Sequence, residues 1–386
     1  MMSRSSKREL VGTLRPRYLK GSRADKERIL DELVATVGYH RKYAIRVLNH
    51  EPPKRSKAQR ISRRKYGAEV EFALRKVWRV ANCIAAKRLV PNLKEFVEAL
   101  ERFGEIRFEG NTRELLLDIS PATADRLLRR ARQVEGQHHG KSTTKPGTLL
   151  KHSIPVRTFA DWQDAKPGFA ELDLVAHCGE SPHGEYVNTL NSVDVATRWT
   201  EPVAIVNRSQ AAVSAALVTI RQRLPFNLLG IDSDNGSEFI NANLKRYCEQ
   251  EQITFTRSRP YKKNDQAYVE QKNWTGVRQF VGYSRYEGQR ACDHLSRLYT
   301  PLRLYLNYFQ PVMVLIEKVR DGAKVKKRYD QAKTPYQRVL ESAEGSDEIK
   351  CRLRQEYLAL NPAALLREIE ARQNALWRVA NDNPKE

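Results

Sequence analysis

Three acidic residues in the middle of the chain have the types and spacing that could bind divalent cations. Asp173 lies in the apolar stretch LDLV, Asp234 precedes the turn signal Asn235-Gly236, and Glu270 follows with 35 residues between it and Asp234. Taken singly, the first could be a satisfied buried acid and the second part of a polar turn. Three carboxylates that met without a cation would repel one another. Together they indicate two Mg²⁺ ions, a site suited to in-line attack on a phosphodiester.

The elements that would position these acids follow from a change of periodicity near residue 157. Alternating patterns predict strands over 169–178, 184–197, 198–207, 226–233 and 253–258, and helical patterns predict helices over 209–224, 237–252 and 265–283. In chain order these are three strands, a helix, a strand, a helix, a strand and a helix. This order predicts an α/β layered core with a mixed five-stranded sheet. If the first and fourth strands are neighbours, Asp173 and Asp234 point to one place, and the last helix can add Glu270.

The residues around the acids resemble a known family. LDLVAH around Asp173, DNGSEF from Asp234, RPYKKND at 259–265 and EQKN from Glu270 are similar to the retroviral-integrase superfamily. Within it, they look most like the DDE transposases of bacterial insertion sequences. The tail over 307–340 also resembles the segment that follows the core in such transposases. The resemblance covers 157–340, and the N-terminal part matches only in general layout.

The resemblance implies a ribonuclease-H-like core and a chemistry. The activity would be Mg²⁺- or Mn²⁺-dependent cleavage of mobile-element ends, followed by attack of the freed 3′-hydroxyl on target DNA. Asp173 would bridge two metal ions, Asp234 would hold one and Glu270 the other, while Lys272 and Asn273 would contact DNA nearby. The chain lacks the His-His-Cys-Cys zinc module of retroviral integrases. Helix-turn-helix modules, as in the bacterial relatives, would replace it.

Positive charge is concentrated in the N-terminal part of the chain. The net charge is +22, and residues 1–150 contribute +17 of it. A basic segment on a near-neutral core is typical of nucleic-acid binding, whereas a membrane surface is disfavoured because no aromatic inserting face is evident. Helices expected over 24–37 and 39–50 fit a helix-turn-helix, and a plain helical hairpin would give the same pattern. The cations of the second helix expected to contact DNA are Arg41, Lys42 and Arg46.

A second helical DNA-binding module is expected over 67–135, after a first module and basic linker over 1–66. Its segment SPATADRLLRRAR starts with N-cap and first-turn residues and carries Arg126, Arg129 and Arg130. It could be a second recognition helix, and a basic surface helix is nearly as good an interpretation.

The remaining boundaries place a linker at 136–156, the catalytic core at 157–289 and an accessory region at 290–386. Lys262 and Lys263 precede the helix of Glu270 and are expected to contact phosphate. The accessory region is predicted to be mostly helical, with a small hairpin around Asp321-Gly322.

Composition excludes several classes of protein. The five cysteines are dispersed without a CxxC pair, which argues against a disulfide framework and a zinc ribbon. No apolar run reaches the length of a membrane span, so a bacterial cytoplasmic, nucleoid-associated protein is expected. The hypothesis is a DNA transposase that acts on double-stranded DNA as a homo-oligomer. The alternatives are a catalytically silent DNA-binding derivative, which a broken triad would mark, and a hydrolytic nuclease of the same fold, which would not join strands.

Overall fold

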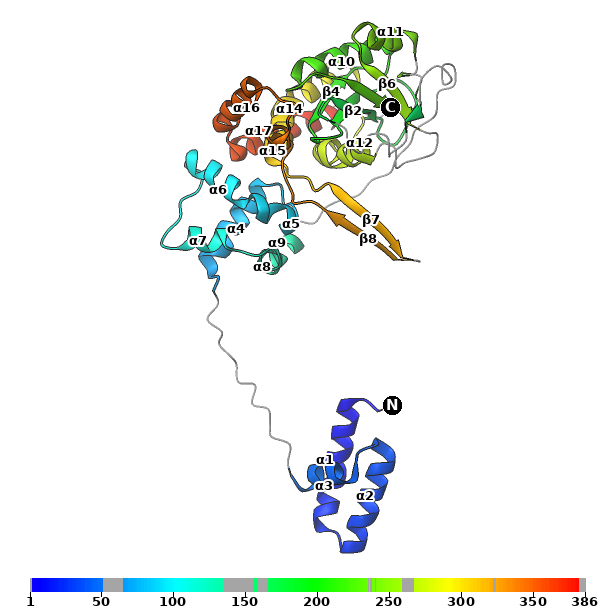
Figure 1. Cartoon of the computed structure of the whole chain (residues 1–386), viewed down its shortest axis with the longest axis vertical. Coiled ribbons are helices and arrows are strands. Elements are labelled where there is room, and N and C mark those ends of the chain that lie inside the picture. Colours follow the sequence, from blue (N-terminus) through cyan, green and yellow to red (C-terminus); the bar gives the residue numbers. More distant parts are fainter. Residues whose placement is uncertain are drawn as a thin grey trace. The chain divides into compact units, whose positions relative to one another are not determined.

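The computed structural model describes residues 2–50, 65–134, 156–157, 166–234, 236, 238–239, 241–258, 267–321 and 324–381 (Figure 1). Two compact units make up the chain, Met1–Lys65 and Tyr66–Glu386. The predicted phosphate-contacting residues Lys262 and Lys263 lie outside the described residues. No helix in the described ranges is long and apolar enough to cross a bilayer.

The N-terminal unit consists of helices α1 (Arg4–Lys20), α2 (Arg23–Val37) and α3 (Arg41–Asn49). Helix α2 begins at a capping box formed by Ser22 and Asp25 and ends at Gly38, whose φ of 72° closes the helix. The unit has a core of its own, built from Leu14, Tyr18, Ile29, Leu30, Leu33, Val37, Ala44 and Leu48. Helices α2 and α3 lie at the two positions predicted on either side of Gly38, whereas α1 was not predicted.

The second unit opens with a set of short helices. They are α4 (Ala68–Val80), α5 (Ala86–Leu89), α6 (Leu93–Arg102), α7 (Thr112–Leu117), α8 (Pro121–Leu127) and α9 (Arg129–Val134), with a 3-10 turn at Val90–Asn92. Their apolar residues belong to the same core cluster as those of the sheet. Tyr305 donates a hydrogen bond of 2.6 Å to the carbonyl of Val80, and Arg88 Nε donates one of 2.8 Å to the carbonyl of Pro311. These helices therefore pack directly on the C-terminal region.

A mixed sheet forms the centre of the second unit. Its strands are β1 (Val156–Arg157), β2 (Phe169–Ala176), β3 (Asn188–Asp194), β4 (Thr200–Ile205), β5 (Gly230–Ser233) and β6 (Thr254–Ser258), in the spatial order β1-β6-β5-β2-β3-β4. Strands β2, β3 and β4 are antiparallel neighbours, while β5 runs parallel to β2 and β6 parallel to β5. Helix α10 (Gln210–Arg223) precedes β5, and α11 (Ala242–Gln250) precedes β6. The predicted five-stranded, ribonuclease-H-like core is confirmed, and β1 adds a two-residue strand at its edge.

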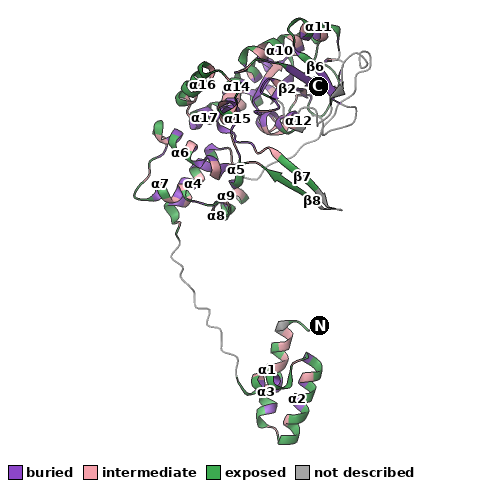
Figure 2. Cartoon of the chain, in the orientation of Figure 1, coloured by how far each residue is buried: buried purple, intermediate pink, exposed green. Residues whose placement is uncertain are grey.

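The C-terminal region is helical apart from one hairpin, as predicted. Helix α14 (Gly288–Phe309) is largely buried, and α15 (Pro335–Glu341), α16 (Asp347–Ala359) and α17 (Pro362–Asn381) follow later in the chain. Between α14 and α15, strands β7 (Leu315–Asp321) and β8 (Lys324–Tyr329) pair with each other and form a separate two-stranded sheet. Figure 2 shows that this hairpin is mostly exposed.

Candidate active site

The pairing of β2 with β5 brings two of the predicted acids side by side. The parallel register matches Glu171 with Asp232 and Leu172 with Ser233. The next residue along each chain is Asp173 on β2 and Asp234 directly after β5. Because the strands run in the same direction, both carboxylates lie at the same edge of the pair. The neighbouring strands proposed from the sequence are therefore present.

Asp173 is a half-buried carboxylate with two hydrogen-bond donors. The amide of Leu174 donates to Oδ1 over 2.8 Å, and Nδ2 of Asn273 donates to Oδ2 over 2.6 Å. Burial, together with the charges of Asp234 and, less strongly, Glu270, raises the pKa of Asp173 to about 7. Both other predicted acids thus act electrostatically on Asp173, as expected of carboxylates that share one site.

A tight turn fixes the carboxylate of Asp234. The amide of Gly236 donates to Oδ1 over 2.9 Å, and a Cβ at Gly236 would lie 2.9 Å from that oxygen and 2.7 Å from Cδ of Glu238. A side chain at this position would therefore force the side chains of Glu238 and Asp234 to move. Burial raises the pKa of Asp234, and Glu238 contributes in the same direction.

A buried acid that the sequence analysis missed positions Glu270. Oε2 of Glu171 accepts hydrogen bonds from the amides of Tyr268, over 3.0 Å, and Val269, over 2.9 Å. These amides belong to the first turn of α12 (Ala267–Lys272), where a carboxylate also complements the helix dipole. The guanidinium of Arg198 stacks 3.5 Å from the ring centre of Tyr268. The helix that carries the exposed Glu270 is thereby attached to β2, two residues before Asp173.

Asn273 and Lys272 point to different surroundings. After α12 the chain forms a π-helical segment, Asn273–Arg278, a feature that is frequent at functional sites. Asn273 binds Asp173, and Nδ2 of Asn191 donates to Oδ1 of Asn273 over 2.8 Å. Lys272 is buried and lines a separate cavity of about 430 Å³ together with Arg88. Burial, and then the charges of Arg88 and Arg198, lower the pKa of Lys272 to about 7.

The donor set suits a hard cation. Carboxylate oxygens are the ligands that Mg²⁺ prefers, and the raised pKa values of Asp173 and Asp234 mark a site where a cation would relieve repulsion. Within the described residues, no three His, Cys, Asp or Glu side chains are grouped closely enough to hold a metal ion. Asp173 and Asp234 are the two predicted ligands that the structure brings to one edge of the sheet, while Glu270 is exposed on α12 and does not complete a three-carboxylate group with them.

Other acids near the site are occupied by structural contacts. Asp232 is buried and accepts a hydrogen bond of 2.7 Å from Thr256. Asp194 accepts hydrogen bonds from the amides of Gly168, over 2.8 Å, and Thr197, over 2.7 Å. Both acids hold neighbouring backbone or side-chain groups in place.

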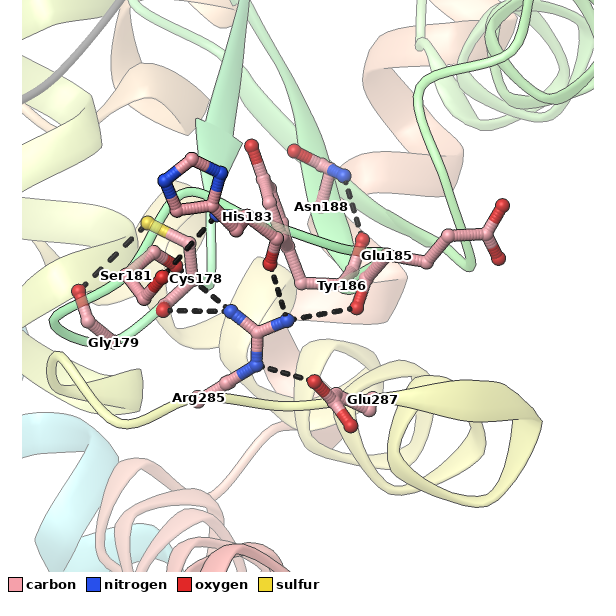
Figure 3. Close-up of polar contacts among 9 residues, drawn as sticks. All are labelled: Cys178, Gly179, Ser181, His183, Glu185, Tyr186, Asn188, Arg285 and Glu287. Atoms are coloured by element: carbon pink, nitrogen blue, oxygen red, sulfur yellow. Dashed lines mark hydrogen bonds and ion pairs between the residues drawn. The ribbon is translucent and has the colours of Figure 1, made fainter. Parts of the chain in front are cut away.

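The loop between β2 and β3 is held by one arginine (Figure 3). This arginine is Arg285, whose guanidinium contacts the carboxylate of Glu287. It donates hydrogen bonds to four backbone carbonyls of the loop, those of Cys178 at 3.2 Å, Ser181 at 2.8 Å, His183 at 2.8 Å and Glu185 at 3.2 Å. The strands that carry Asp173 and Asn191 are thus joined by a loop with its carbonyls satisfied.

The cations predicted to contact DNA in the N-terminal unit differ in their availability. Lys42 and Arg46 are exposed on α3. Arg41 contacts Asp31 and lies 3.4 Å from Glu27, so its charge is partly matched within the unit.

The second predicted basic helix is interrupted. Helix α8 ends at Leu127 and α9 begins at Arg129, so Arg126 and Arg129 stand on different short helices. Arg126, Arg129 and Arg130 are all exposed. An uninterrupted recognition helix over this segment, as the sequence suggested, is not what the structure shows.

The sheet order and the paired acids define the class of protein. The integrase core domain family matches residues 163–263, a span that contains Asp173 and Asp234. Residues 163–263 of the chain therefore form an integrase core domain. It is similar to the uncharacterized protein y4rM of Sinorhizobium fredii, with 44% identity over 342 residues, which are 87% of this chain and 96% of the relative. It also aligns with the crystal structure of the catalytic core domain of BIV integrase at a TM-score of 0.30 and 18% identity, covering 44% of this chain and 91% of that one.

Proposed function

We propose that this protein is a DNA transposase that cleaves the ends of a mobile element and joins them to target DNA. The observation that carries the proposal is the adjacency of Asp173 and Asp234 on parallel strands, with Glu270 acting electrostatically on Asp173. Carboxylates so arranged suit phosphodiester chemistry that depends on divalent cations.

In this proposal Asp173, Asp234 and Glu270 hold two Mg²⁺ or Mn²⁺ ions. Bound there, the ions would activate the attacking oxygen and stabilise the leaving oxygen. Asn273 orients the carboxylate of Asp173 through its 2.6 Å hydrogen bond. Glu171 fixes the start of α12, so that Glu270 stays at the same edge of the sheet.

We assign the binding of duplex DNA mainly to the N-terminal unit. Residues 1–65 contain nineteen Lys and Arg against six Asp and Glu, a net charge of +13. Exposed Lys42 and Arg46 on α3 offer contacts to phosphate or to base edges. Affinity that depends on such charges falls steeply as salt rises, because binding releases counterions.

The direct test is a reaction of the purified full chain with duplexes that carry the ends flanking its own gene. In Mg²⁺, the proposal expects 3′-end cleavage and products joined to a second duplex. Cleavage without joining would identify a hydrolytic nuclease of the same fold. Binding without either reaction would identify a catalytically silent DNA-binding protein.

A further inference from the structure

The hairpin β7–β8 is a mostly exposed ribbon (Figure 2), and its sequence is rich in positive charge. The segment 315–329 contains two acids, Glu317 and Asp321. Its cations are Lys318, Arg320, Lys324, Lys326, Lys327 and Arg328. The excess of four positive charges is carried by only fifteen residues. This density favours a polyanionic partner.

Four apolar residues of the ribbon are largely exposed. Ile316, Val319, Val325 and Tyr329 are 59%, 46%, 44% and 43% exposed. The register pairs Val319 with Lys326 and, on the next rung, Val325 with Arg320, so the two valines lie on opposite faces. A two-stranded hairpin alone in water is marginally stable at best. Exposed apolar residues on both faces indicate that a partner surrounds the ribbon rather than covering one side.

Three cations of the ribbon, Lys326, Lys327 and Arg328, follow one another on β8. Lys318 stands directly opposite Lys327, and like charges in such a pair are destabilising. Lys326, Lys327 and Arg328 are exposed, and none forms an ion pair with a residue in the part of the chain that the structure describes. Binding of an anion would remove this repulsion.

The base of the ribbon, in contrast, is firmly held. The amide of Val314 donates to Oδ1 of Asp330 over 2.6 Å, and the amide of Asp330 donates back to the carbonyl of Val314 over 2.9 Å. Arg338 on α15 lies 2.8 Å from Asp330 and donates to the carbonyl of Val312 over 2.9 Å. Buried Tyr336 and Val339 fix α15 in the core. The ribbon is therefore an arm with an anchored base.

We propose that the β7–β8 arm binds duplex DNA by entering the major groove. The proposal rests on the transposase function proposed above and adds a contact surface to it. The major groove, about 12 Å wide, admits a two-stranded β-ribbon. Strands of six and seven residues extend roughly 20 Å, enough to cross the groove. Phosphates on both sides would meet the cations of the arm, and its valines would meet the base edges.

The test uses the full chain with Lys326→Gln, Lys327→Gln and Arg328→Gln combined. The matched control removes three arginines of α16 and α17 that are also exposed, through Arg352→Gln, Arg354→Gln and Arg378→Gln. Affinity for an element-end duplex should fall tenfold or more in the arm variant. The slope of log affinity against log salt should drop by roughly two to three, about 0.9 for each lost phosphate contact. The control should show neither change, and amides 315–329 of the wild type should exchange more slowly when DNA is bound.

The outcomes separate the arm from the function as a whole. A wild-type protein that does not bind duplex DNA would contradict the transposase proposal. If the wild type binds duplex DNA and the arm variant has the same affinity and salt slope, only the proposed role of the arm is overturned. If the arm variant kept its DNA affinity but lost binding to phosphatidylserine vesicles, the arm would be assigned to a membrane surface. If it kept its DNA affinity but lost a dimer, the arm would be assigned to a second copy of the chain. Either result would overturn the proposed role of the arm.

Discussion

Asn273 donates a hydrogen bond of 2.6 Å to Oδ2 of Asp173, which lies 100 positions earlier in the chain. The bond joins the segment after α12 to the central strand β2. A hydrogen bond to the charged form of a carboxylate lowers its pKa, and Asn273 has this effect on Asp173. The two elements that carry Asp173 and Glu270 are thus connected close to the proposed catalytic carboxylates.

Asn273→Ala is expected to weaken activity without unfolding the core. Loss of the donor should raise the pKa of Asp173, so the acidic limb of the pH–activity profile should move to higher pH. The concentration of Mg²⁺ needed for half-maximal activity should rise as well, since the carboxylate is less often charged. Thr275→Ala is the control, because Thr275 lies in the same segment and its hydroxyl donates to the carbonyl of Gln271. An unshifted pH profile in Asn273→Ala would refute the role of this bond.

Asp173→Asn should stabilise the metal-free protein in a pH-dependent way. The pKa of Asp173 is raised from 3.8 to about 7 in the fold, so its contribution to stability is fully present below about pH 4 and is lost as the pH rises through 7. The Tm of the variant, relative to wild type in EDTA, should therefore increase from pH 4 to pH 8. Mg²⁺ at pH 8 should raise the Tm of the wild type and leave the variant unchanged. A wild-type Tm that does not respond to Mg²⁺ would count against a metal site here.

Lys272→Met should also raise stability, but with the opposite relation to pH. The pKa of Lys272 is lowered from 10.5 to about 7 because burial and two arginines disfavour the ammonium. The cost of the buried charge therefore grows as the pH falls from about 10.5 towards 7. Thermal unfolding should show a larger gain in Tm at pH 7 than at pH 10. Lys87→Met, which removes an exposed lysine beside Arg88, should show no such trend.

Arg285→Ala should loosen the loop between β2 and β3. The variant leaves four carbonyls without their shared donor, and the free energy of unfolding should fall by about 2 kcal/mol. Amide hydrogen exchange over 178–186 should become faster than in wild type. Arg285→Lys keeps the charge but lacks the planar fork, so it should restore little of the protection. Unchanged exchange in both variants would show that the loop does not depend on this residue.

Much of the core could be predicted because its signals are local. Strand alternation, the N-cap at Ser209 and the turn at Gly236 are all properties of short stretches of sequence. The adjacency of β2 and β5 was the condition under which Asp173 and Asp234 could share one site, and the strand register shows that the condition holds. Helix α1 went unpredicted because its burial is confined to few residues, such as Leu14 and Tyr18.

The positioning of the site depends on contacts that no local pattern encodes. Glu171 binds amides 97 and 98 positions later in the chain, and its only signal in the sequence is a second acid in an otherwise apolar strand. Lys272 follows Glu270 by two residues, which places it on another side of the helix, and Arg88 from the preceding helices lies near it. Tertiary packing thus determines that Asn273 of the EQKN stretch contacts Asp173, whereas Lys272 lines the cavity.

The most direct test of the metal-dependent transposase site compares Asp234→Asn with Asp232→Asn in a strand-joining assay. Asp234→Asn removes one of three carboxylates, so cleavage and joining in Mg²⁺ should fall together by roughly a thousandfold or more. Affinity for element-end duplexes should stay unchanged, because the recognition elements lie elsewhere. Asp232→Asn keeps an oxygen that can accept from Thr256 and should retain most activity. An inactive Asp232→Asn with an active Asp234→Asn would contradict the assignment of the site.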